Sequence, residues 1–167
     1  PCPCDGAAGG IWRFQDGAPW TRINPDTSAG FPFVFDRFVI GINPNNENEV
    51  YFLGSTPGYG HFNEYINSID WTSLWKYTYI SGDGSGAGGQ WQNLSENLPN
   101  IGTEFDRFAA QGGYDLVVKV TGVPDPSTGY VSDSVDVQVT SRFNRGGDDL
   151  SVNSRRLEQR FTYRAAQ

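Results

Sequence analysis

Ser81-Gly82-Asp83-Gly84, followed after a glycine-rich insert by Gly89-Gln90-Trp91, is the stretch that decides the fold of this chain. A shorter copy, Asp16-Gly17-Ala18-Pro19-Trp20, stands earlier, and its tryptophan lies 71 positions before Trp91. Residues 35–38 and 105–108 both read Phe-Asp-Arg-Phe and keep an offset of 70 positions. Two markers with nearly the same offset indicate an internal repeat. Such a repeat informs the architecture of the fold and says much less about a chemical activity.

The composition predicts a β-rich chain with an aromatic core. Among the 167 residues, 37% are hydrophobic and 14% are aromatic, so rings supply much of the apolar volume. The 21 glycines and 10 prolines predict frequent turns, and no amphipathic pattern of ordinary helical length is present. A chain of this length holds one or two domains.

The charge narrows the range of partners. A formal net charge of −7 disfavours nucleic acid, because phosphate binding requires a basic surface, and it disfavours anionic membranes for the same reason. No apolar run reaches the length of a membrane-spanning helix, so no membrane insertion is expected. Other protein chains or carbohydrate remain as partners, and a homo-oligomer is compatible with both.

Apolar runs and turn residues together predict antiparallel hairpins. Residues 33–42 and 50–53 are expected to pair across a polar, asparagine-rich loop. Residues 74–80 and 90–94 are expected to pair across the glycine-rich insert. The fold class is therefore predicted to be mostly β.

Three regions are expected along the chain. Residues 1–10 form a flexible leader, residues 11–120 hold the repeat, and residues 121–167 form a C-terminal region of β-strands. Within the repeat region, residues 63–69 are expected to form a helical turn in a long loop. In the last region a period of two, typical of a half-buried strand, is carried by Val135, Val137 and Val139.

The segment from Ile11 to Val120 resembles the Asp-box, or BNR, repeats of β-propellers in secreted bacterial proteins. Their pattern is Ser-x-Asp-x-Gly-x-x-Trp, between the third and fourth strands of a blade. The matching positions are Ser81, Asp83, Gly84 and Trp91, with an insertion, and Asp16, Gly17 and Trp20 in a shorter form. The resemblance implies antiparallel hairpins of propeller-blade type and an extracellular or cell-surface location. A propeller has at least four blades of about forty residues, so this one is expected to be incomplete.

The residues of the two boxes are expected to be structural. A short acidic side chain accepts hydrogen bonds from the backbone amides of its own turn, and glycine adopts backbone angles closed to other residues. The tryptophan is expected to cover the hairpin and to pack between blades. Turn roles are therefore predicted for Asp16, Gly17, Trp20, Ser81, Asp83, Gly84 and Trp91.

No residue is assigned a catalytic role. His61 is the only histidine, and no nucleophile elbow of the form Gly-x-Ser-x-Gly accompanies it in a strand-to-helix context. With a single histidine, no metal site and no cofactor are expected. Glycoside hydrolysis requires a pair of carboxylates, and the sequence leaves open the separations of Glu64, Asp70, Glu104 and Asp106.

Rings are concentrated between residues 59 and 79. Exposed rings can stack on sugar faces, which suits an acidic secreted protein, whereas buried rings would form the core on which small β proteins rely. The core is the preferred interpretation. If the region instead forms a binding surface, its residues are expected to be Tyr59, His61, Tyr65, Trp71 and Trp75.

Cys2 and Cys4 are separated by one proline, and a disulfide across so short a span would be strained. They are either free thiols at a frayed end or intermolecular bridges.

The preferred function is a secreted, non-enzymatic structural or interaction module that binds carbohydrate or protein. The second is a self-assembling subunit of an extracellular filament, pilus or phage appendage. The third is a fragment of a sialidase-like glycoside hydrolase.

Overall fold

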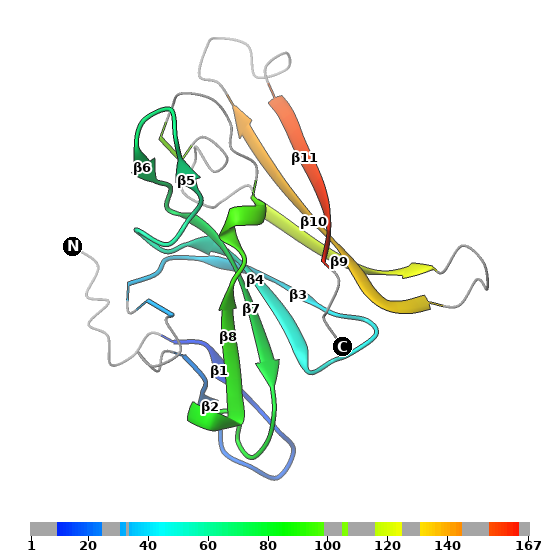
Figure 1. The fold of residues 1–167 in the computed structure, drawn as a ribbon. Coiled ribbons are helices and arrows are strands. Elements are labelled where there is room, and N and C mark those ends of the chain that lie inside the picture. The colour runs from blue at the N-terminus through cyan, green and yellow to red at the C-terminus, as the bar shows by residue number, and fades with distance from the viewer. Residues whose placement is uncertain are drawn as a thin grey trace.

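The computed structural model describes residues 10–24, 31–32, 34–98, 105–106, 116–124, 131–144 and 154–163, with side chains up to residue 122. These residues form antiparallel sheets (Figure 1). Within them no α-helix occurs, and the only helical segments are two 3-10 turns, η2 (Gly86–Gly88) and η3 (Ser95–Asn97). The prediction of a mostly β fold is confirmed. The sheets in the described part of the chain form neither a closed barrel nor a propeller.

The central sheet has four antiparallel strands in the order β3-β4-β7-β8. Both predicted hairpins are confirmed, because β3 pairs with β4 and β7 pairs with β8. A smaller hairpin of β1 and β2 precedes this sheet, and a second one of β5 and β6 lies between β4 and β7. The bounds are β1 (Trp12–Arg13), β2 (Thr21–Arg22), β3 (Phe38–Ile42), β4 (Glu49–Ser55), β5 (Phe62–Asn63), β6 (Ser68–Ile69), β7 (Thr72–Tyr79) and β8 (Gly89–Asn93).

The helical turn expected at residues 63–69 is wrong, because this segment is the β5–β6 hairpin. The Asn63 side chain accepts a hydrogen bond of 3.1 Å from the Tyr65 N–H, which is the local contact of an Asx turn. Asn67 then takes a positive φ of 50°, which reverses the chain. The Asn63 hydrogen bond and the left-handed backbone of Asn67 thus close a tight turn, whereas a helix would require right-handed backbone angles at every residue.

The second sheet contains β9 (Leu116–Pro124), β10 (Val131–Asn144) and β11 (Ser154–Tyr163), in the order β11-β10-β9. A register shift between Val131 and Val135 marks a bulge in the pairing of β10 with β9. Strands β10 and β11 lie within residues 121–167, where β-strands were expected. Strand β9 continues through the division expected between residues 120 and 121.

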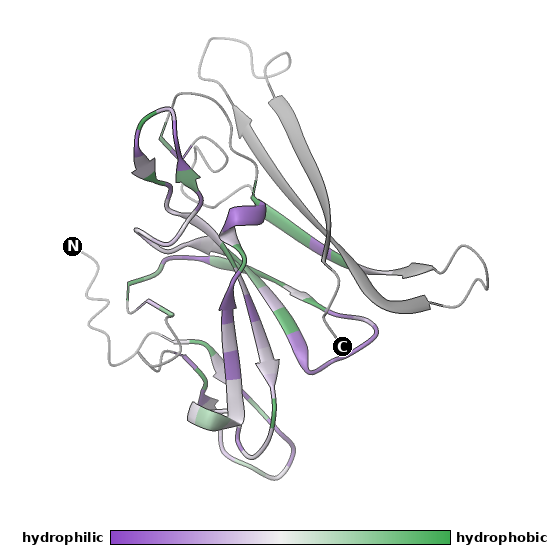
Figure 2. Cartoon of the chain, viewed as in Figure 1, coloured by the Kyte–Doolittle hydropathy of each residue, from purple (hydrophilic) through white to green (hydrophobic). Residues whose placement is uncertain are grey.

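The two middle strands of the central sheet, β4 and β7, are largely buried on both faces. On one face Tyr51, Leu53 and Leu74 pack with Leu94, Leu98 and Leu116, and the valines of β9 lie against them. On the other face Phe52, Trp75, Tyr77 and Trp91 pack with Ile23 and Phe31 from the N-terminal region. Figure 2 shows the hydrophobic start of β9 where it meets the central sheet. Strands β4 and β7 therefore carry buried apolar side chains on both sides, as expected of the middle layer of a three-layer arrangement.

Candidate functional site

The β5–β6 hairpin and its surroundings carry a group of exposed apolar side chains, which we name the hairpin surface. Register places Phe62 directly opposite Ile69, so both lie on one face of the hairpin. Trp71 meets Phe105 edge to face, with ring centroids 5.4 Å apart. The members are between 40% and 67% exposed, and they are Tyr59, Phe62, Tyr65, Ile69, Trp71 and Phe105.

The opposite face of this hairpin is polar and buried, which explains why the rings point outward. Asn63 is 1% exposed and Asp70 is 6% exposed. Successive side chains of a strand point to opposite faces, so burying Asn63 and Asp70 directs Phe62 and Ile69 to solvent. This hairpin thus buries its polar face and exposes its apolar face, whereas an ordinary surface hairpin buries its apolar face.

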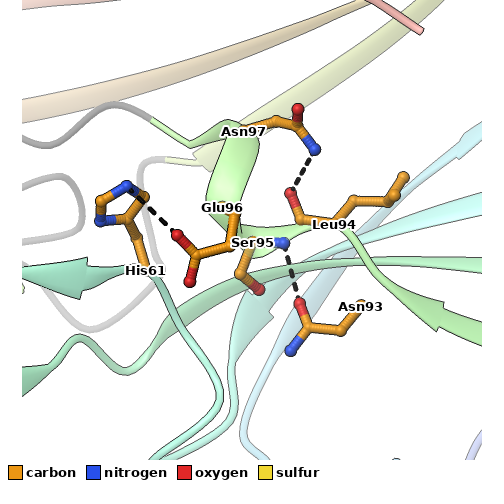
Figure 3. A network of polar contacts seen from close by, with 6 residues as sticks. All are labelled: His61, Asn93, Leu94, Ser95, Glu96 and Asn97. Carbon is orange, nitrogen blue, oxygen red and sulfur yellow. Dashed lines mark hydrogen bonds and ion pairs between the residues drawn. The ribbon is translucent and has the colours of Figure 1, made fainter.

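Polar contacts hold the hairpin to the end of β8. The Asn93 amide donates a hydrogen bond of 2.9 Å to the Tyr59 carbonyl. His61 Nε2 lies 3.6 Å from Glu96 Oε2 in the turn η3 (Figure 3). That turn is itself capped, because Asn93 Oδ1 accepts a bond of 2.8 Å from the Ser95 N–H. His61, predicted as a binding residue, therefore contributes to anchoring the hairpin.

Beneath the hairpin surface, two carboxylates lie close together. Asp70 accepts a hydrogen bond of 2.9 Å from the Asp106 N–H, and Asp106 accepts one of 2.7 Å from the Thr72 N–H. Burial raises the pKa of the Asp106 carboxyl above its ordinary value, the neighbouring Asp70 adds to this rise, and the hydrogen bond from the Thr72 N–H opposes it. Asp106 also has a positive φ of 48°. The pair ties residues 105–106 to the beginning of β7, although 36 positions separate the two carboxylates.

Trp75 does not belong to this surface, and its prediction as a binding residue is wrong. It is 2% exposed, and its Nε1 donates to Ser73 Oγ at 3.0 Å. Its ring packs between Phe31 and Tyr59, with centroids 4.9 Å and 5.9 Å away. Period-two alternation on β7 sends Trp75 and Tyr77 to the same buried face. The rings between residues 59 and 79 thus divide between core and surface.

The second Asp-box copy forms a closed loop between β7 and β8. Asp83 Oδ1 accepts hydrogen bonds from the Ser85 N–H at 2.9 Å and the Ser85 hydroxyl at 2.7 Å. These bonds hold the pKa of Asp83 below its ordinary value, the hydroxyl contributing most. Ser81 acts through its backbone, accepting from the Gly84 N–H at 3.1 Å. Trp91 is 7% exposed and packs on the central sheet.

The first copy differs in its tryptophan. Asp16 and Gly17 form a turn, closed by the Ala18 N–H donating to the Gln15 carbonyl at 3.0 Å, and Gly17 has a φ of +79°. Trp20 is 62% exposed and contacts Phe14, with centroids 5.1 Å apart. The expectation that Trp20 packs between blades is not met in the described structure, where Trp20 is exposed and contacts Phe14 within the small β1–β2 hairpin.

The two copies lie side by side in space. The Arg13 guanidinium sits 4.1 Å from the centroid of the Tyr79 ring, next to the second loop. Trp91 Nε1 donates to the Ile23 carbonyl at 2.9 Å, across 68 positions of sequence. The β1–β2 hairpin therefore closes over the end of the β7–β8 hairpin.

Between the β1–β2 hairpin and the central sheet lies a cavity with a volume of about 230 Å³. Its lining is mostly apolar, with Arg13, Glu47 and Asn48 as the polar members. No sequence pattern predicted this cavity, because its walls come from five separate segments of the chain. The lining residues are Ile11, Trp12, Arg13, Ile23, Ile40, Glu47, Asn48, Val50, Phe52, Tyr77 and Tyr79.

Two further predictions concern a metal site and a membrane-spanning segment. Among the described residues no group of three or more His, Cys, Asp or Glu side chains is placed to hold a metal ion. No helix in that part of the chain is long and apolar enough to cross a membrane. Cys2 and Cys4, expected to be either free thiols or intermolecular bridges, lie outside the described residues.

Phe62, Ile69 and Phe105 belong to the hairpin surface and were not among the predicted binding residues. Phe105 belongs to the second Phe-Asp-Arg-Phe segment, whose repetition was the signal that this position matters. Ile69 had no distinguishing signal, since its exposure follows only from the strand pairing with Phe62. Comparison with protein-family models, with curated proteins and with solved structures gives no match for this chain.

Proposed function

We propose that this chain is a non-enzymatic binding module of the extracellular space or cell surface, and that the hairpin surface binds carbohydrate. The observation that carries the proposal is the outward placement of five rings and Ile69 around a hairpin whose polar side is buried. Several exposed apolar side chains around one hairpin point to an interaction site, because leaving them in water is unfavourable.

Anchoring supports a binding role over a merely flexible loop. The contacts of Tyr59 with Asn93, His61 with Glu96, and Asp106 with Thr72 hold the hairpin and Phe105 to the central sheet. Rings held in place before binding lose little conformational freedom when a ligand arrives, which improves affinity. The apolar C–H face of a pyranose ring fits such a platform.

The charge of the chain favours a neutral sugar. With a net charge of −7, long-range repulsion opposes uronic or sialic acids. A protein partner with an apolar patch is the alternative occupant of the hairpin surface, and the experiment below separates the two.

We infer, in addition, that the central sheet is a single unit of propeller-blade type. The support is its strand order, β3-β4-β7-β8, with the Asp83 loop joining the third of these strands to the fourth. That position is the one implied by the resemblance to Asp-box repeats.

We keep hydrolysis outside the proposal, although Asp70 and Asp106 are brought together. Asp70 is 6% exposed, and both carboxylates accept backbone N–H groups. A general acid or nucleophile has to reach the glycosidic bond, so this pair is better suited to holding the backbone. Chromogenic glycosides test the point, and turnover that disappears in Asp106→Asn while the fold is retained would restore the hydrolase interpretation.

The test of binding is affinity electrophoresis and calorimetry with neutral polysaccharides. The variant Tyr65→Ala/Trp71→Ala is expected to weaken binding at least about tenfold, the effect of losing roughly 1.4 kcal/mol. Trp20→Ala is the matched control, because it removes an exposed ring from the β1–β2 hairpin and is expected to bind like the parent. Equal loss in both variants, or no polysaccharide binding by the parent chain, contradicts the proposal. Binding of a protein partner that Tyr65→Ala/Trp71→Ala abolishes would favour the alternative.

A further inference from the structure

Strand β3 is an edge strand without the usual protection. It lies at the end of the order β3-β4-β7-β8 and reads Phe38-Val39-Ile40-Gly41-Ile42. Natural sheets guard their edges with charged side chains, prolines or bulges. Strand β3 has neither charge nor proline, and its pairing with β4 is regular over all five residues.

The register shows which backbone groups of β3 are left over. Asn43 donates to the Glu49 carbonyl at 3.0 Å, and antiparallel pairs alternate between bonded and non-bonded positions. Val39 and Gly41 therefore exchange hydrogen bonds with β4. The N–H and C=O groups of Phe38, Ile40 and Ile42 point away from β4, and no described residue pairs with them.

The side chains of the same positions are available. Ile40 is 59% exposed and Ile42 is 57% exposed, both on the face that carries Phe52 and Trp91. On the other face, Val118 and Val120 of β9 occupy the space beside Gly41. Among the described residues, the outer edge of β3 thus offers unpaired backbone groups beside two exposed isoleucines.

We propose that β3 pairs in antiparallel fashion with β3 of a second copy of this chain, about a two-fold axis at Ile40. In this register Ile40 lies opposite its own copy, Phe38 lies opposite Ile42, and Val39 lies opposite Gly41. All three outward-facing residues then meet outward-facing residues, so every free N–H finds a C=O. The two central sheets become one sheet of eight strands.

The absence of charged side chains on β3 makes this strand a place where two copies can approach each other. Each chain carries a formal charge of −7, so two copies repel wherever acidic surfaces face each other. An uncharged strand is the place where that repulsion is least. An isologous interface also requires a self-complementary patch, and five residues centred on Ile40 provide one. This inference concerns a different surface from the hairpin surface and does not depend on carbohydrate binding.

The experiment is native mass by light scattering at about 100 µM protein, a concentration at which a micromolar interface is nearly saturated. The parent chain is expected to show twice the chain mass. Ile40→Lys and Ile40→Glu are each expected to show the chain mass, because two like charges then face each other at the axis. An equimolar mixture of the two is expected to recover twice the chain mass, and only folded variants can do so.

Val34→Lys is the matched control, since Val34 is 69% exposed and lies outside β3, and it is expected to remain dimeric. Amide exchange supplies an independent readout. The amides of Ile40 and Ile42 are expected to become protected only as the concentration rises, whereas those of Val39 and Gly41 are protected throughout. A parent chain that is monomeric at 100 µM, or an Ile40→Lys variant that still dimerises, overturns the proposal.

Discussion

The two Asp-box copies share a turn and differ in the fate of their tryptophans. In both, a glycine with positive φ follows the aspartate, at Gly17 and at Gly84. Trp91 then enters strand β8 and is buried against the central sheet, whereas Trp20 remains 62% exposed beside Phe14. The difference teaches that the motif encodes a local reversal of the chain. Burial of its tryptophan depends on whether a further layer covers the strand that follows.

The largest expected effect is the difference in stability between the two variants that each remove one tryptophan. Trp91→Ala is expected to lower the free energy of unfolding by about 3–5 kcal/mol, because it leaves a cavity in the core and removes the hydrogen bond to the Ile23 carbonyl. Trp20→Ala is expected to lower it by about 0.5 kcal/mol or less, as for most exposed positions. Urea denaturation measures both. Similar losses in the two variants would show that Trp20 is covered in solution.

A smaller effect is expected at the glycines of the same turns. Gly17→Ala and Gly84→Ala both force a left-handed backbone on alanine, at about 1–2 kcal/mol each. At Gly84 the new Cβ would also come within 2.5 Å of the Tyr77 hydroxyl, whereas nothing lies within 4 Å at Gly17. Gly84→Ala is therefore expected to be less stable than Gly17→Ala by at least about 1 kcal/mol. Thermal unfolding compares the two, and the reverse ranking would contradict the closeness of Tyr77 to the loop.

The smallest effect concerns the second repeated marker, the aspartates of the Phe-Asp-Arg-Phe segments. Asp36 is exposed and accepts from the Arg37 N–H at 2.8 Å, whereas Asp106 is partly buried and has a raised pKa. An acid with a raised folded-state pKa favours folding below its unfolded pKa, and this contribution is lost as the pH rises through the folded value. Asp106→Asn keeps an acceptor for the Thr72 N–H and is expected to remove that loss.

The measurement is the unfolding free energy of the parent and of both variants between pH 3 and pH 8. The gain of Asp106→Asn over the parent is expected to grow with pH above about 4, the ordinary value for aspartate. Asp36→Asn is the control and is expected to track the parent. A gain that shrinks as the pH rises would mean that the ionised Asp106 is stabilised by a partner.

Local pattern sufficed for the hairpins of the central sheet. The run 74–80 and the turn residues Gly82, Asp83 and Gly84 predicted the β7–β8 pairing, because alternation and positive-φ glycines are properties of neighbouring residues. The β5–β6 hairpin escaped prediction, since its asparagines are compatible with either a turn or a helix end.

The candidate site was less predictable than the fold. Tyr59, Tyr65 and Trp71 were predicted as binding residues and lie on the surface. Trp75 belongs to the same aromatic-rich stretch and was predicted with them, yet it is buried. Whether such a ring is core or surface depends on strand parity and on what packs above it. The nearness of Asp70 and Asp106 likewise depends on the path of the chain between them.

By itself, the sequence determined that this protein is mostly β, that its main sheet is built from sequential hairpins, and that its turns are made by glycine and aspartate. These properties follow from backbone angles and from the period of apolar residues, which act over a few positions. Only the tertiary structure decided that Trp91 is buried and Trp20 exposed, that the hairpin surface faces solvent, and that β3 lies at the end of the central sheet's strand order. Each of these depends on contacts between segments distant in sequence, and a local sequence pattern does not predict such contacts.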